Sequence, residues 1–131
     1  MYKTILCAVE VGEEGDAVIA KAKQLAEKFD SELILISVLP YSFLPKDYQK
    51  ELEDKAIPEF EAFALKHDVV SKKSILKVGK PYVVICDQAN YINADLIVLG
   101  THSKSGISSL LGSTATGVSN QAHCDVSLVR I

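Results

Sequence analysis

A loop rich in glycine and serine lies between Asp95 and Thr114, and its residue types suit anion binding. The loop ends in Gly112-Ser113-Thr114, a step that is typical of the start of a helix. Glycines let a backbone come close to a ligand, and the unpaired N–H groups of a helix's first turn attract negative charge. The pattern therefore indicates a phosphate site. A turn in which Ser113 merely caps its own helix fits the same residues.

This loop matches neither of two common phosphate-binding motifs. A Walker A loop needs a lysine after its last glycine, and the segment GSTATG at 112–117 has none. A dinucleotide fingerprint would be GxGxxG after the first strand, and this loop follows a later one. His102 lies in the loop without a nucleophile motif or a carboxylate placed to orient it, so we interpret it as a polar loop residue. We predict no catalytic residue and no metal site, because no paired histidines or Cys/His cluster occur in the sequence.

Strand and helix patterns alternate along the chain. Near-continuous apolar runs predict strands that are covered on both faces, and apolar residues at helical spacing predict helices. The strands are expected at 2–10, 31–39, 74–78, 95–99 and 126–131, and the helices at 16–29, 47–67, 81–92 and 113–122. Asp16 is the expected cap of the first helix, and Pro58 is expected to kink the second helix or to divide it in two.

This alternation predicts one α/β domain over residues 1–131. The expected architecture is a five-stranded, parallel, doubly wound sheet of order 3-2-1-4-5 with helices on both faces. Ligands of such sheets bind at the carboxyl ends of the strands, where successive connections diverge to opposite faces. That crevice would lie between the first and fourth strands, so Glu10 and Gly100 should face each other across it.

Composition excludes several classes of protein. The 131 residues are 48% apolar and 24% charged, which is typical of one globular domain with an ordinary core. A net charge of −3 offers a nucleic acid no electrostatic support, and no apolar run has the length of a membrane span. The chain enters a strand pattern at once, so we expect no signal peptide. The three cysteines show no disulfide or zinc spacing, and Cys7 and Cys86 are predicted to be buried thiols. We expect a cytoplasmic protein.

Four segments of the chain resemble the universal stress protein family. They are the run KTILCAVE, the turn Gly79-Lys80-Pro81, the block ADLIVLGTHSKSG and the ending LLGSTATGVSNQAHCDVSLVRI. The resemblance covers nearly the whole chain. It implies a stress-response sensor or switch, the 3-2-1-4-5 sheet, homodimers and, in one branch, ATP held in the crevice. We expect the homodimer to form through the exposed final strand at 126–131.

The resemblance also implies nucleotide-binding residues. Gly100 matches the first glycine of the family's phosphate motif, and Gly112 with Ser113 matches the closing pair. Glu10 stands where nucleotide binders have an aspartate that contacts the nucleoside. The expected binding residues are Ala8, Glu10, Val38, Leu99, Gly100, Ser103, Lys104, Gly112, Ser113 and Thr114. Among these, Ala8, Val38 and Leu99 match the family's apolar contacts with the nucleotide.

The chain departs from the family's motif in the middle of the loop. Ser103 occupies the second glycine position, where a left-handed backbone would cost about 1–2 kcal/mol. Only residues 104–111 separate Ser103 from Gly112, one fewer than the family's spacing. A second branch of the family has lost the glycine motif. The resemblance thus implies ATP or another adenine nucleotide, with or without Mg²⁺. The alternative is a dimeric protein of the same family that holds no nucleotide and acts through partners or phosphorylation.

A slow ATPase is a third reading of the same residues. The catalytic histidine motif of the wider superfamily, HxGH, would follow the first strand, and this chain has VGEEGD there. The expected protein is therefore a binding module without fast turnover.

Overall fold

Strands and helices alternate along the residues that the computed structural model describes, 1–101 and 112–131. The strands are β1 (Thr4–Ala8), β2 (Glu32–Leu39), β3 (Ser74–Val78), β4 (Leu96–Gly100) and β5 (Asp125–Val129). The helices are α1 (Glu13–Phe29), α2 (Lys46–Lys66), α3 (Pro81–Tyr91) and α4 (Ser113–Gln121), with a 3-10 turn, η1 (Ser71–Lys73), before β3. His102, Ser103 and Lys104 lie outside the described residues.

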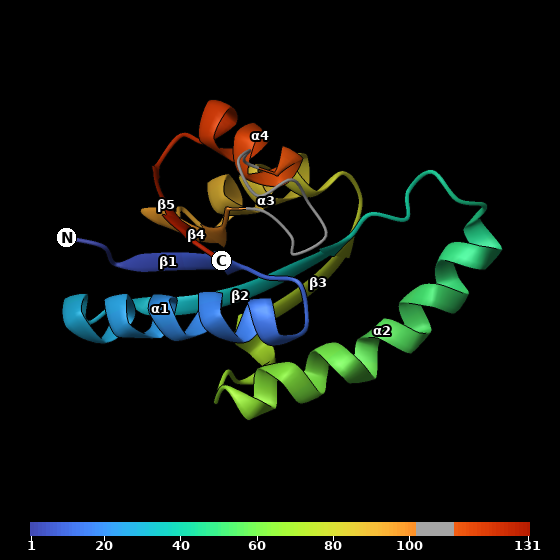
Figure 1. The fold of residues 1–131 in the computed structure, drawn as a ribbon, viewed down its shortest axis with the longest axis horizontal. Coiled ribbons are helices and arrows are strands. Elements are labelled where there is room, and N and C mark those ends of the chain that lie inside the picture. Colours follow the sequence, from blue (N-terminus) through green and yellow to red (C-terminus); the bar gives the residue numbers. More distant parts are fainter. Residues whose placement is uncertain (102–111) are drawn as a thin grey trace.

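The strands form a parallel five-stranded sheet in the order β3-β2-β1-β4-β5 (Figure 1), which confirms the predicted architecture. The central strand β1 pairs with β2 on one side and with β4 on the other, so that Leu6 lies beside both Ile34 and Ile97. The side chains of β1 are buried from Ile5 onward. This burial explains why the first strand reads as a continuous apolar run.

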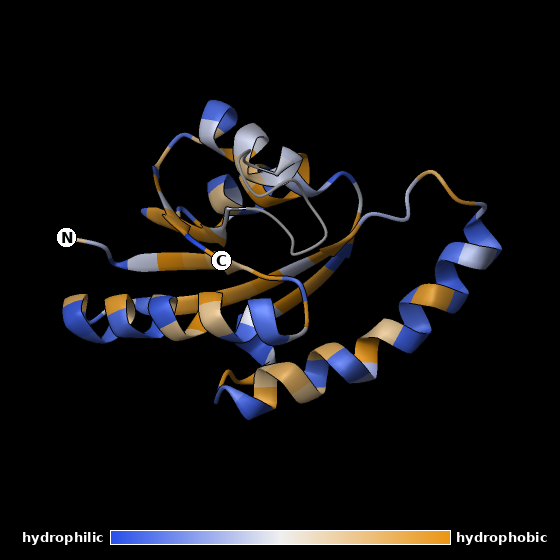
Figure 2. Cartoon of the chain, in the orientation of Figure 1, coloured by the Kyte–Doolittle hydropathy of each residue, from blue (hydrophilic) through white to orange (hydrophobic). Residues whose placement is uncertain are grey.

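Helices cover both faces of the sheet and close a separate apolar core on each. On one face, α1 and α2 pack Val18, Phe60 and Phe63 against the strands. On the other face, Ile85 of α3 and Val118 of α4 lie against Leu6 and its neighbours. Figure 2 shows this division as apolar strands between helices of mixed hydropathy. The chain after β1 and the chain after β4 therefore leave the sheet toward opposite faces.

The structure corrects one expectation about a helix start and decides between two readings of another. The helix α1 begins at Glu13 with Gly12 as its N-cap, so Asp16 lies inside the helix and does not cap it. Gly12 has a φ of 137°, a conformation that favours glycine, and this lets the chain turn into the helix earlier than the apolar spacing indicates. Ser113 is the first helical residue of α4 and Gly112 is the cap, which excludes the reading in which Ser113 caps its own helix.

The region around Pro58 forms one helix, so the expectation of two separate helices is not met. The helix α2 runs from Lys46 to Lys66 with Pro58 inside it, and its axis bends in Figure 1. Proline has no N–H to donate to the preceding turn and its ring crowds that turn, which is a common cause of such a bend.

The buried-thiol prediction is confirmed. Cys7 and Cys86 are both buried and, like the half-buried Cys124, are free. Burial raises the pKa of the Cys7 thiol above its ordinary value. Since the thiolate is the reactive form, Cys7 has a structural role in the core.

Candidate functional site

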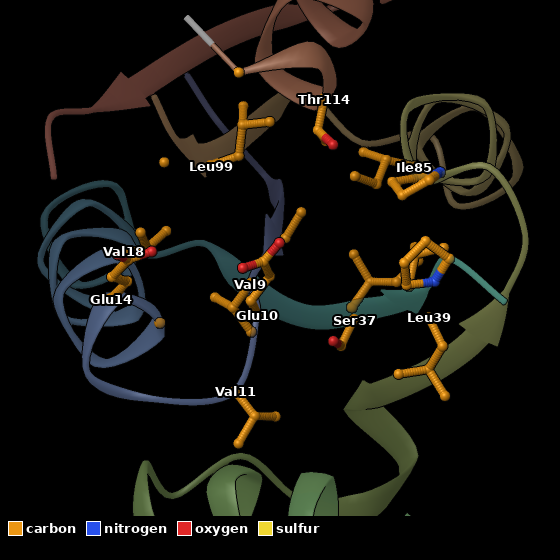
Figure 3. Close-up of a pocket in the computed structure, with 18 of the residues that line it drawn as sticks. Val9, Glu10, Val11, Glu14, Val18, Ser37, Leu39, Ile85, Leu99 and Thr114 are labelled. Carbon is orange, nitrogen blue, oxygen red and sulfur yellow. The ribbon is translucent and has the colours of Figure 1, made fainter. Parts of the chain in front are cut away.

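A pocket of about 420 Å³ opens at the carboxyl ends of β1, β2 and β4 (Figure 3). Its walls come from the ends of these strands, from the first turns of α1 and α4, and from the middle of α2. The chain leaves β1 toward α1 on one face and leaves β4 toward α4 on the other. This is the switch point at which doubly wound sheets bind ligands.

The pocket brings together every predicted site residue that the structure describes. Those in its lining are Ala8, Glu10, Val38, Leu99, Gly100, Gly112, Ser113 and Thr114. Glu10 and Gly100 thus share one pocket, as expected from the strand order. Ser103 and Lys104 lie outside the described residues, so their positions are not part of this lining.

The first turn of α4 forms one end of the pocket. The backbone N–H of Gly112 donates to Thr101 O at 2.7 Å, and this bond ties the helix start to the end of β4. The N–H groups of Ser113 and Thr114 belong to the first turn, where a helix offers no acceptor of its own. Such groups, together with the helix dipole, make this end suitable for an anionic group.

Carboxylates lie on the opposite side of the pocket. Glu10 follows β1, Glu14 belongs to the first turn of α1, and Glu59 belongs to α2. Figure 3 shows Glu10 and Glu14 on the side of the pocket that β1 and α1 form. The Oε1 atom of Glu14 is buried and has no hydrogen-bond partner within the described part of the chain. An unpaired buried carboxylate oxygen is costly, so this wall favours a ligand or a solvent molecule that donates a hydrogen bond.

Gly15 explains how the chain holds Glu10 at this edge. A Cβ at Gly15 would overlap the backbone carbonyl oxygen of Glu10 and would lie 3.2 Å from Cζ of Phe63. Only glycine therefore allows the first turn of α1 to pack directly on the backbone that carries Glu10.

Several lining residues were missed by sequence reasoning. One is Ser37, a buried polar residue of β2 next to Val38. Another is Tyr41, which lies just after the end of the same strand. Glu14 and Phe60 come from helices that the sequence pattern shows only as amphipathic. An alternating polar residue in an apolar strand could have indicated Ser37. No local signal indicates which turn of α1 or α2 reaches the pocket.

The described residues show neither a metal-binding cluster nor a membrane-spanning helix. They contain no group of three or more His, Cys, Asp or Glu side chains placed to hold a metal ion. None of their helices has the length and apolarity that crossing a bilayer would require.

Comparisons with known proteins agree on one family. The sequence model of the universal stress protein family matches residues 1–130. The chain is 34% identical over 140 aligned residues to universal stress protein A homolog 2 of Coxiella burnetii, covering 99% of this chain and 96% of that relative.

Solved structures of the same family share the fold. Universal stress protein UspA from Lactobacillus plantarum superposes with a TM-score of 0.76 at 24% identity, covering 98% of each chain. A universal stress protein in complex with cAMP superposes with a TM-score of 0.75 at 20% identity, covering 98% of this chain and 97% of that one.

Proposed function

The chain belongs to the universal stress protein family, and from this premise we propose that it is an adenine-nucleotide-binding stress-response module. One observation carries the proposal. The site residues inferred from sequence come from separate strands and loops, yet each one that the structure describes lines the same pocket. A structural neighbour in the family binds cAMP, an adenine nucleotide, which supports the choice of ligand class.

The proposed pose runs across the strand ends. The phosphates lie on the N–H groups of Ser113 and Thr114. Glu10 accepts hydrogen bonds from the ribose hydroxyls. The base lies against the apolar side chains of the pocket, which include Ala8, Val38 and Leu99.

Glu14 adds a second acceptor to this pose. Its unpaired Oε1 needs a donor, and a ribose hydroxyl or a water molecule bound to Mg²⁺ is a donor of the right kind.

Isothermal titration with ATP, ADP, AMP and cAMP tests the proposal. We expect binding of at least one of these nucleotides, and its loss in Gly112→Val, because a branched side chain would cover the N–H groups of the helix start. The absence of heat and of a thermal shift at millimolar concentrations of all four would refute nucleotide binding.

A matched pair of glutamate variants tests the ribose contact. Glu10→Gln removes a charged acceptor in the pocket, and we expect about tenfold or greater loss of affinity. Glu13→Gln makes the same change at an exposed neighbour that does not line the pocket, and it should bind as the wild type does. Equal nucleotide affinities of the two variants would contradict the proposed contact between Glu10 and the ribose.

We also propose a homodimer formed through β5. This strand lies at the edge of the described sheet, beside β4 alone, and Leu128 on it is exposed. Pairing with a second β5 about a twofold axis would complete its hydrogen bonds. Sedimentation should give a dimeric mass that Leu128→Lys reduces to a monomer, and a monomeric wild type at micromolar concentration would exclude the dimer.

Dimerisation without nucleotide binding would favour the second candidate function, an interaction protein that acts through partners. The exposed edge strand is the observation behind that candidate. Multiple turnovers of ATP that are lost in His102→Ala would instead indicate an enzyme. The free thiols suit a reducing cytoplasm, where we expect the protein to act.

A further inference from the structure

The helix α2 carries an apolar stripe that only partly packs on the fold. The stripe has a spacing of four residues and consists of Tyr48, Leu52, Ala56, Phe60 and Ala64. Residues four apart are neighbours on a helix surface, but such a row turns by about 40° at each step because a helix has 3.6 residues per turn. The stripe therefore winds gradually around α2, and its first three residues share one face of the part before Pro58.

Burial changes sharply along this stripe. Phe60 is 4% exposed and packs in the core beside Phe63 and Ala64. Tyr48 is 49% exposed, and Leu52 is only partly buried. Figures 1 and 2 show the first part of α2 standing away from the sheet, with apolar residues along it.

The chain before α2 is fastened to the free part of the helix. The Gln49 side chain donates from Nε2 to the backbone oxygens of Ser42 at 3.1 Å and Leu44 at 2.8 Å. The Leu44 N–H donates to Tyr41 O at 3.0 Å. These bonds join residues 41–44 to the first turns of α2, and residues 41–57 are called the arm from here on.

Pro58 separates the arm from an anchored helix end. It removes one hydrogen bond of the helix and bends the axis, which makes this turn the easiest place to change direction. Beyond it, α2 is held to α1 because Lys66 Nζ lies 3.1 Å and His67 Nε2 lies 2.6 Å from the Asp16 carboxylate. Lys23 of α1 also donates to His67 O at 2.9 Å.

Both ends of the arm meet the pocket. Tyr41 at its start and Ala56 near its end line the pocket, as does Phe60 just past the bend. Ala56 shares one face of the arm with Leu52 and Tyr48, so that face meets the pocket at its Ala56 end. From Ala56 to Tyr48 the helix extends about 12 Å at 1.5 Å per residue, a length comparable with that of a nucleotide.

We propose that the arm closes over the pocket when the nucleotide binds. It turns at Pro58 and brings Tyr48 and Leu52 against the bound ligand and the pocket's edge. Closure buries apolar surface that is exposed in the open form, so the gain in burial is coupled to occupancy of the pocket. The surface of the protein around the arm therefore differs between the nucleotide-free and the nucleotide-bound protein. This inference rests on the proposed nucleotide-binding function.

A single tryptophan on the arm tests closure, because the chain contains none of its own. In Tyr48→Trp, saturating ATP should shift the emission to shorter wavelength and reduce quenching by acrylamide at least twofold. Tyr91→Trp is the control, since Tyr91 is 83% exposed at the end of α3 and does not line the pocket. Its emission should not change.

A pair of serine variants tests the stripe itself. Leu52→Ser should weaken ATP binding about threefold to tenfold by removing apolar surface that closure buries. Lys50→Ser changes an exposed residue on the opposite face of the arm and should leave the affinity unchanged. Both positions are solvent-accessible, so both variants should fold.

The outcomes separate this inference from the function on which it rests. ATP binding by titration without any change in the emission of Tyr48→Trp would overturn closure and leave nucleotide binding intact. Absence of ATP binding would overturn both. An emission change in Tyr48→Trp that follows protein concentration without ATP would mean that the arm docks on a second copy, which also overturns closure.

Discussion

The two parts of α2 share one helix and one apolar stripe, yet they have different roles. The part after Pro58 packs Phe60 and Phe63 into the core, whereas the part before it stands free with Tyr48 half-exposed. The reason is that α2 is longer than the sheet on which it packs. The 21 residues of α2 extend about 31 Å, while the 5 residues of the neighbouring strand β3 extend about 17 Å. The apolar stripe on α2 is therefore buried only as far as the sheet beneath the helix reaches.

Removing a core ring from the anchored part should have the largest effect. Phe63→Ala should lower the free energy of unfolding by about 3–5 kcal/mol, because the side chain is 5% exposed and its loss leaves a cavity. Leu65→Ala, at a position that is 77% exposed in the same part of α2, should change it by less than about 0.5 kcal/mol. Urea denaturation measures both values. Similar losses in the two variants would contradict the anchored packing.

Crowding the contact between α1 and the anchored part should have the next largest effect. Gly15→Ala places a methyl group on the Glu10 carbonyl oxygen and near the Phe63 ring, and should cost about 1–3 kcal/mol. It should also weaken ATP binding, since the backbone that carries Glu10 must shift. Glu13→Ala is the control at an exposed position of the same turn. Wild-type stability of Gly15→Ala in thermal melts would show that α1 can move away freely.

Acid should loosen the anchored part through Asp16. Hydrogen bonds from His67 and then from Lys66 lower the pKa of the Asp16 carboxyl below its ordinary value. The folded state therefore gains stability from the ionised form above about pH 4, the ordinary aspartate value, and loses it as pH falls through the lower folded value. Asp16→Asn should make the melting temperature less dependent on pH in that acidic range. An unchanged pH profile would mean that these bonds do not anchor α2.

Changing the arm should have the smallest effect on stability. Leu52→Ala should alter the free energy of unfolding by less than about 0.5 kcal/mol in the absence of nucleotide, because the side chain is only partly buried before closure. The same urea titrations measure it. A loss as large as that of Phe63→Ala would show that the arm is packed already, and the contrast between the two parts of α2 would disappear.

Local sequence features account for much of the fold. The apolar run through β1 predicts a central strand, and the alternation of strands with helices predicts a parallel, doubly wound sheet. The resemblance to the universal stress proteins implies its order, β3-β2-β1-β4-β5. Asp16 shows where such reasoning stops. Its residue type favours a helix cap, but the structure pairs it with His67, a residue 51 positions away in the chain. Partners at that separation are set by how α1 and α2 pack, which no local pattern contains.

The candidate site also contains residues that the sequence indicates and residues that only the structure reveals. The step Gly112-Ser113-Thr114 and the end of β1 at Glu10 are recognisable in the sequence because their chemistry is local: a helix start offers N–H groups, and a strand end presents a side chain at the sheet edge. Glu14 and Phe60 join the pocket only because their helices cross the strand ends at particular turns.

By itself the sequence indicated the family, with its strand order, and the helix start at Gly112-Ser113-Thr114 that forms one end of the pocket. These depend on residue type and on spacing along the chain. Only the tertiary structure decided which turns of α1 and α2 complete the pocket and how much of the α2 stripe is buried. Those outcomes depend on where helices end relative to the sheet, which is a property of packing in three dimensions.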